Sequence, residues 1–108
     1  TLYQGFHDFI YIDDFIAGIH LLVNKQGTPR GEIVNFGSGQ QWSNFVVAEL
    51  FRRVVGHDAP ITIEHKMVKA YESNVWICDT SYSKAVHKFT CHYDLESGIQ
   101  KFLELAEY

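Results

Sequence analysis

The sequence is poor in basic residues and in long apolar runs, and each shortage excludes a class of protein. Its 108 residues include nine Lys and Arg against thirteen Asp and Glu, which gives a net charge of −4. A protein that binds duplex nucleic acid or an anionic membrane surface needs a clustered positive field, and the nine basic residues are scattered. No apolar run approaches the ~20 residues of a membrane-spanning helix. We therefore expect neither a nucleic acid nor a membrane as partner.

Cysteine is also scarce, because Cys78 and Cys91 are the only two. They could form one bridge at most, and no signal-peptide pattern accompanies them, so we expect reduced thiols and a cytoplasmic location. The stretch "HKFTCH" brings His87, Cys91 and His92 close together in the sequence. The paired ligand spacing of a zinc site is missing, so we expect no metal site.

Only part of a dinucleotide-binding glycine pattern is present. The stretch "GSG" at 37–39 stands between an expected strand and an expected helix, where a phosphate-binding turn belongs. Trp42 occupies the position where a third glycine would let helix and strand pack closely. A glycine-rich connection without a ligand is therefore favoured over a cofactor site.

The sequence is rich in apolar and aromatic residues, at 46% and 15%, so a chain of this length should bury a core as one domain. Apolar spacing predicts an α/β fold, because short strands alternate with helices. The expected strands are 9–12, 33–36 and 61–64, with an extended piece at 75–78. The expected helices are 14–25, 43–56, 81–88 and 94–107, with Ser43 capping the second and Gly56 ending it.

Two adjacent aspartates, Asp13 and Asp14, lie where the first strand pattern changes to a helical one. A carboxylate at this point accepts hydrogen bonds from the free N–H groups of the first helical turn and meets the positive end of the helix dipole. The pair could instead serve as acid and base in catalysis. We favour a capping role for one of the two.

Five stretches in order resemble a known family: "HDFIYIDD", "GEIVNFGSGQQWS", "VAELFRRVVG", "DTSYSKA" and "DLESGIQKFLE". Over residues 5–107 they are similar to the C-terminal part of the extended short-chain dehydrogenase/reductases, which include NAD-dependent nucleotide-sugar epimerases and dehydratases. The resemblance implies the substrate-binding part of a Rossmann-type enzyme. Residues 1–108 would then be a single domain, the substrate-side fragment of a larger enzyme whose N-terminal cofactor domain is absent. The first residue, Thr1, fits a piece of a longer chain.

The resemblance also implies substrate-binding residues. Where the family has an arginine that contacts the diphosphate of the sugar nucleotide, this sequence has His7. The family's second arginine is replaced by the stretch "HKMVKAYESNVW", in which Lys66 and Lys69 are the substitutes. A histidine lacks the bidentate fork of arginine and carries only part of a charge near neutral pH.

The family's catalytic equipment is missing from this chain. None of the six tyrosines is followed by lysine four positions later, as the family's Tyr-x-x-x-Lys pair requires, and the G-x-x-G-x-x-G cofactor turn is absent. We expect no catalytic and no cofactor-binding residue here, with NAD or NADP and a nucleotide-sugar implied only for a full-length parent.

Two hypotheses follow from these absences. The chain is either the substrate-binding segment of such an enzyme, not catalytic by itself, or a stand-alone non-enzymatic interaction or oligomerisation module derived from that fold. Strand edges and apolar helix faces of the free chain would be uncovered without the rest of such an enzyme, so we expect self-association or docking to an N-terminal Rossmann domain.

Overall fold

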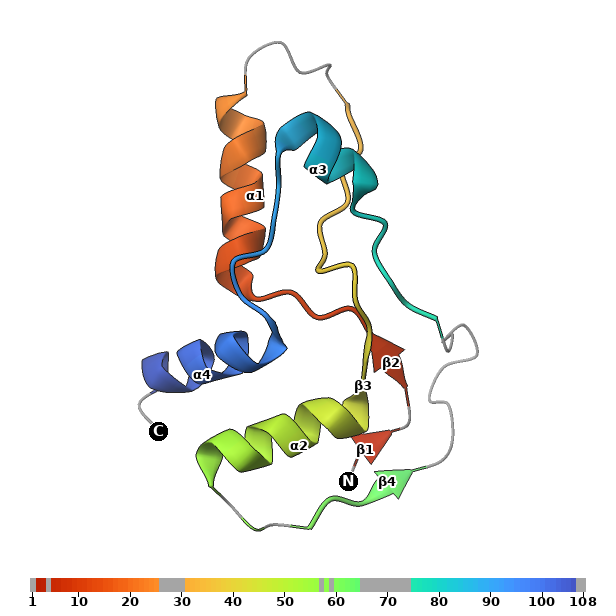
Figure 1. Ribbon diagram of the computed structural model, residues 1–108, viewed down its shortest axis with the longest axis vertical. Coiled ribbons are helices and arrows are strands. Elements are labelled where there is room, and N and C mark those ends of the chain that lie inside the picture. The colour runs from red at the N-terminus through yellow and green to blue at the C-terminus, as the bar shows by residue number, and fades with distance from the viewer. Residues whose placement is uncertain are drawn as a thin grey trace.

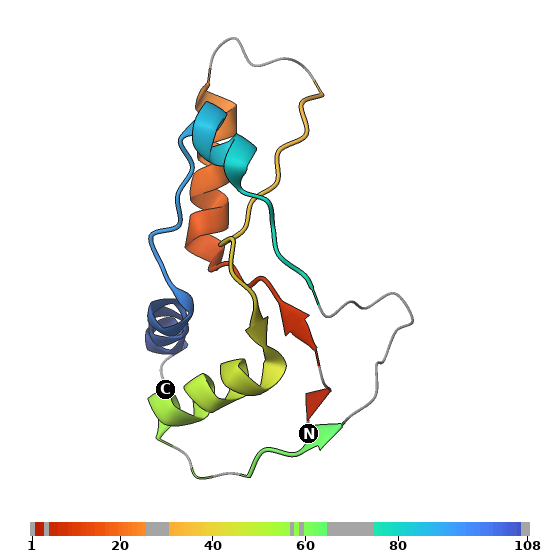
Figure 2. The same cartoon turned by 45° about the vertical axis from the view of Figure 1, so that its right-hand side comes forward.

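The computed structural model describes residues 2–3, 5–25, 31–56, 58, 60–64 and 75–106. The molecule measures 51 × 36 × 17 Å and has a radius of gyration of 16.4 Å. A compact chain of this length would have a radius of gyration of about 13 Å. Figures 1 and 2 show a thin, elongated arrangement, with two helices at each end and extended segments between them. The chain therefore forms little more than one layer.

Four helices are present in the described residues, and all four were expected from apolar spacing. They are α1 (Ile12–Asn24), α2 (Asn44–Val55), α3 (Ser81–His87) and α4 (Leu95–Leu105). Helices α1 and α3 lie side by side at one end, and α2 packs on α4 at the other (Figure 1). The rings of Phe51 on α2 and Phe102 on α4 meet edge to face at 6.3 Å.

The strands are shorter than expected and form two separate pairs. Strand β1 (Leu2–Tyr3) pairs in parallel with β4 (Ile63–Glu64), and β2 (Phe6–His7) pairs antiparallel with β3 (Trp42–Ser43). The strand expected at 61–64 is thus confirmed over its last two residues. The strands expected at 9–12 and 33–36 are wrong, because no described segment hydrogen-bonds to either as a ladder partner.

Side-chain and backbone caps define the ends of α2 and the start of α4. The Ser43 hydroxyl accepts a hydrogen bond from the Val46 N–H at 3.1 Å, and Gly56 ends α2 in the left-handed conformation at φ 74°. Both roles were expected. At the start of α4, the Asp94 carboxylate accepts from the Ser97 N–H while the Ser97 hydroxyl accepts from the Asp94 N–H, which is a capping box.

The capping role expected for Asp13 or Asp14 is wrong. Helix α1 begins at Ile12, Tyr11 holds the N-cap position, and no side chain caps it. Asp14 is only 1% exposed, and its carboxylate accepts from the His92 N–H at 2.9 Å and the Tyr93 N–H at 3.0 Å. The helix instead presents Asp14 to a segment distant in sequence, while Asp13 stays exposed in the first turn. The end of α1 is as expected, with Lys25 as the C-cap residue.

The core is small. The buried apolar side chains of the described residues are Phe89, Ile99 and Leu103. Phe36 extends this core, since the centroid of its ring lies 4.6 Å from that of the Phe89 ring. The Phe36 ring also packs against α1 at Gly18. A Cβ at Gly18 would lie 3.0 Å from the Phe36 ring, so the small residue allows this close approach.

Many large apolar side chains remain exposed. On α1 they recur at helical spacing and so share one face: Ile12, Phe15, Ile16, Ile19 and Val23. Ile33 and the segment 75–77 add further exposed apolar side chains. Within the described part of the chain, no helix is both long enough and apolar enough to span a bilayer.

Candidate functional site

The expected substrate-binding residue His7 lies in β2, opposite Trp42 of β3. Its half-buried ring is 6.1 Å from the ring of Phe9 and meets Trp76 edge to face at 6.3 Å. Trp76 is 50% exposed. Residues from three separate segments therefore surround one imidazole beside an exposed indole. An imidazole at this place has N–H donors suited to an anionic oxygen.

The other two expected binding residues, Lys66 and Lys69, lie outside the described residues. Of the three expected binding residues, the structure thus describes His7 alone.

The residue after His7 has the largest set of hydrogen bonds in this region. The Asp8 carboxylate accepts from the N–H groups of Ser38 at 2.9 Å, Gly39 at 2.9 Å and Cys78 at 3.0 Å, and also from the Ser38 hydroxyl. It joins the strand that carries His7 to the glycine turn and to the segment that carries Trp76. The glycine turn is therefore bound to a carboxylate of its own chain.

This arrangement does not fit a cofactor diphosphate at the turn. The N–H groups that would receive a phosphate already donate to Asp8, whose negative charge would repel the ligand. Gly37 is needed for the same junction, because a Cβ there would lie 2.3 Å from the Cys78 Cβ. The "GSG" stretch thus holds three segments together.

A second polar cluster connects residues far apart in the sequence. His87 Nε2 lies 3.0 Å from Glu32 Oε1, and the Tyr82 hydroxyl donates to the same carboxylate oxygen. The His87 side chain is fully buried. Hydrogen bonds from Tyr82 and His87 hold the pKa of the Glu32 carboxyl below its ordinary value, and the hydrogen bond to Glu32 raises the pKa of Tyr82. This cluster fastens α3 to the segment before the glycine turn.

No metal centre forms among the described residues. The three candidates of "HKFTCH" have other surroundings: His87 pairs with Glu32, and the Cys91 thiol donates to the Gly37 carbonyl at 3.5 Å. Burial is the main cause that raises the pKa of the Cys91 thiol.

Comparison with known proteins identifies the architecture. Neither a protein-family model nor a curated protein matches the chain. Among solved structures, UDP-N-acetylglucosamine 4-epimerase from Bacillus cereus superposes with a TM-score of 0.78 at 17% identity, over 99% of this chain and 35% of that one. UDP-glucose 4-epimerase from Bifidobacterium longum, in complex with NAD+ and UDP, superposes with a TM-score of 0.82 at 16% identity, over 96% of this chain and 30% of that one. The dTDP-glucose 4,6-dehydratase from Bacillus anthracis, in complex with NAD, has a TM-score of 0.78 and 20% identity, over 98% of this chain and 33% of that one.

The chain has the fold of a part of these epimerases and dehydratases. The resemblance inferred from the five sequence stretches is thereby confirmed at the level of fold, as is the α/β class. The chain spans about a third of the length of these epimerases and dehydratases. At such low identities the likeness is one of fold.

The sequence reasoning missed what three carboxylates of this epimerase-like fold do: those of Asp8, Asp14 and Glu32. A signal existed for Asp8, because a glycine turn presents free N–H groups that need an acceptor. No local signal existed for the others, since Asp14 and Glu32 meet their partners 78 and 55 residues away.

Proposed function

We propose that the chain is the substrate-binding segment of a nucleotide-sugar epimerase or dehydratase, and that it acts together with a domain that binds NAD or NADP. The observation that carries the proposal is the extent of the superposition on solved enzymes. Nearly the whole chain superposes on about a third of several solved epimerases and dehydratases, among them a dehydratase in complex with NAD and an epimerase in complex with NAD+ and UDP. The remaining two thirds of such a protein would supply the cofactor site, because the glycine turn of this chain does not fit a cofactor diphosphate.

The uncovered apolar surface supports this proposal. The molecule is 17 Å thick in its shortest direction, and the apolar face of α1 is open to water, with Val23 75% exposed and Ile12 55% exposed. Ile33 is 83% exposed in a segment that has no ladder partner in the described part of the chain. Soluble monomers seldom leave contiguous apolar patches of more than a few hundred Å² uncovered. A Rossmann-type domain docked on this face would cover it.

In this proposal His7 binds the diphosphate of the substrate. The neighbouring Asp8 holds the backbone of β2 against the glycine turn, so the position of the imidazole is well determined. Chemistry on the sugar would depend on residues of the partner domain, because this chain has no Tyr-x-x-x-Lys pair.

The gene sequence upstream of Thr1 tests the proposed function. We expect an open reading frame that encodes a G-x-x-G-x-x-G turn between a strand and a helix, followed by Tyr-x-x-x-Lys. A start codon next to Thr1 would contradict the proposal and support the alternative, a stand-alone interaction or oligomerisation module.

The isolated chain is expected to self-associate at micromolar concentration, because the apolar side chains on one face of α1 are exposed. Analytical ultracentrifugation should show a dimer or a larger species. Ile16→Lys and Ile19→Lys place charge on exposed positions of that face and should shift the distribution toward monomer without loss of helix content. Leu105→Lys, at an exposed position of α4, is the matched control. A wild-type monomer over a hundredfold concentration range would contradict the expectation.

Replacement of His7 by arginine is expected to tighten binding of UDP-glucose about tenfold, since a permanent, bidentate cation then replaces an imidazole. Isothermal titration calorimetry measures the change. Gln100→Arg, which adds the same side chain at an exposed position of α4, should leave the affinity unchanged. Equal affinities of the parent and the His7 variant would show that His7 does not contact the phosphates.

A further inference from the structure

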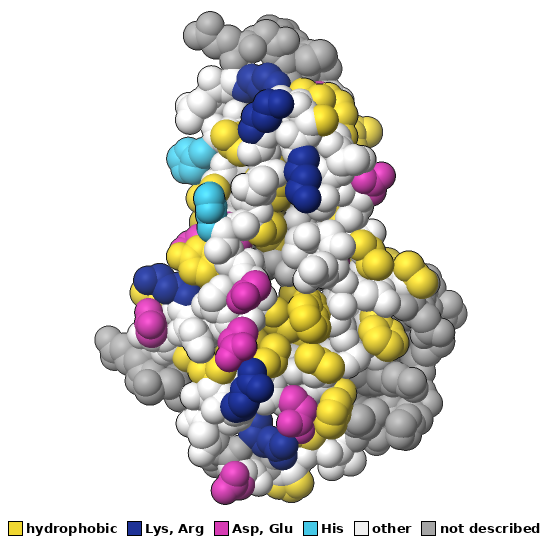
Figure 3. Space-filling model, in the orientation of Figure 1, with side chains coloured by type: hydrophobic (Ala, Val, Ile, Leu, Met, Phe, Trp, Pro, Cys, Tyr) yellow, Lys and Arg dark blue, Asp and Glu magenta, His cyan; other side chains and the backbone are white. Residues whose placement is uncertain are grey.

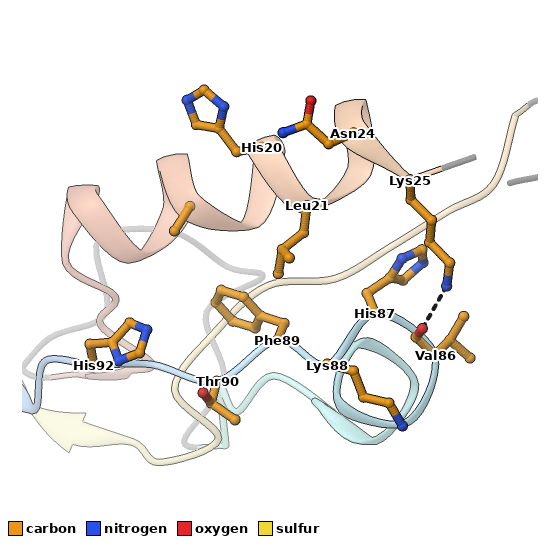
Figure 4. Close-up of a pocket in the computed structure, with 11 residues that line it drawn as sticks. His20, Leu21, Asn24, Lys25, Val86, His87, Lys88, Phe89, Thr90 and His92 are labelled. Carbon is orange, nitrogen blue, oxygen red and sulfur yellow. Dashed lines mark hydrogen bonds between the residues drawn. The ribbon is translucent and has the colours of Figure 1, made fainter.

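An open groove of about 790 Å³ lies between α1 and the segment 86–92, which includes the end of α3. Its volume is in the range of small-molecule sites, about 300–1,000 Å³. Figure 4 shows Leu21 of α1 pointing toward Phe89 on the opposite wall. With Ala17 and Val86, these side chains make the surface of the groove mostly apolar. The groove lies at the α1 and α3 end of the molecule, away from His7 on β2 (Figure 1).

The polar groups of the groove are cationic or neutral. Lys25, Lys88 and three histidines line it, and no Asp or Glu does among the described residues. The whole chain is acidic, with a net charge of −4, so this gathering runs against its overall composition. Figure 3 shows lysine or arginine side chains together with histidines on the upper part of the molecule, where Figure 1 has α1 and α3.

The two lysines are held in place by backbone carbonyls of α3. Lys25 Nζ donates to the Val86 carbonyl at 2.6 Å, as the dashed line in Figure 4 marks, and Lys88 Nζ donates to the Ala85 carbonyl at 3.2 Å. An ammonium group has three N–H donors, so each keeps donors for a ligand. The nearby Glu32 carboxylate already accepts from Tyr82 and His87, and its side chain is only 10% exposed.

We propose that this groove binds a small anion that carries an apolar group. The phosphate or carboxylate would contact Lys25 and Lys88, and the apolar group would lie against Leu21 and Val86. Ligand sites commonly combine such an apolar lining with a few polar groups that orient the ligand. The site is independent of the proposed nucleotide-sugar function, because it shares no residue with the surroundings of His7.

Amide chemical-shift titrations of the 108-residue chain test the site with four probes. Phenyl phosphate and benzoate combine an anion with a ring, inorganic phosphate has the anion alone, and phenol has the ring alone. We expect saturable shifts at 20–25 and 86–92 with phenyl phosphate or benzoate, and affinities about tenfold lower for inorganic phosphate and phenol. The stronger of the first two probes identifies phosphate or carboxylate as the preferred anion.

Variants then separate a site from general electrostatic attraction. Lys88→Gln and Lys25→Gln should each weaken the binding of the stronger probe about fivefold, whereas Lys25→Arg should retain it. Lys101→Gln, on α4, is the matched control and should have no effect. If Lys25→Gln disturbs the fold by loss of its bond to Val86, Lys88→Gln alone decides. The proposal is overturned by a lack of saturable shifts up to about 10 mM probe, by shifts centred on β2, or by equal weakening in the Lys101 variant.

Discussion

Replacement of Asp14 by alanine is expected to lower the free energy of unfolding by about 4 kcal/mol, since a hydrogen bond to a charged group contributes about 1.5–3 kcal/mol. The Asp14 side chain is almost fully buried and accepts from the N–H groups of His92 and Tyr93. Its loss leaves these two donors without their acceptor at the junction between α1 and the segment that leads to α4. Urea denaturation followed by circular dichroism measures the change.

The neighbouring aspartate provides the control. Asp13 is exposed in the first turn of α1, so Asp13→Ala should cost only about 0.5 kcal/mol from the lost interaction with the helix dipole. Asp14→Asn keeps one acceptor oxygen and should fall between the two alanine variants. Similar losses for Asp13→Ala and Asp14→Ala would restore the capping role that the sequence indicated.

Replacement of Asp8 by alanine is expected to lower the free energy of unfolding by about 3 kcal/mol. This loss is smaller than for Asp14, because the Asp8 side chain is only part-buried. The carboxylate joins β2, the glycine turn and the segment at Cys78. Its removal uncovers N–H groups of Ser38, Gly39 and Cys78 that converge on one place, which is an arrangement that binds anions.

An added carboxylate should therefore rescue the Asp8→Ala variant. We expect acetate to raise its melting temperature more than that of the parent or of an Asp8→Asn variant, at equal ionic strength with chloride as reference. Asp79→Ala is a further control, since Asp79 accepts only from the nearby Ser81 among the hydrogen bonds described for it. An equal acetate effect on the parent would contradict the assignment of Asp8 as the group that fills the turn.

The expected helices could be predicted because their determinants are local. Ser43 and Gly56 act within one turn of α2, and the Asp94 and Ser97 pair acts within one turn of α4. Apolar spacing also indicated which residues share a face. The order of the sequence stretches led to the epimerase-like fold, because that order reflects the order of the elements.

The strands at 9–12 and 33–36 were wrong for a physical reason. A strand is defined by hydrogen bonds to a partner, which apolar residues alone do not provide. Residues 9–11 lead directly into α1, where the Tyr11 carbonyl accepts from the N–H groups of Asp14 and Phe15. Residues 33–36 have no ladder partner among the described residues.

The sequence by itself determined the helices, the caps of α2, the α/β class and the likeness to part of an epimerase, because short-range hydrogen bonds and apolar periodicity decide these features. Only the tertiary structure decided what Asp8, Asp14 and Glu32 do. Each of these carboxylates accepts hydrogen bonds from residues at least 30 positions away, and nothing near them in the sequence specifies those partners. The groove beside Lys25 and Lys88 has the same origin, since its two walls, α1 and the segment 86–92, come together only in the folded chain.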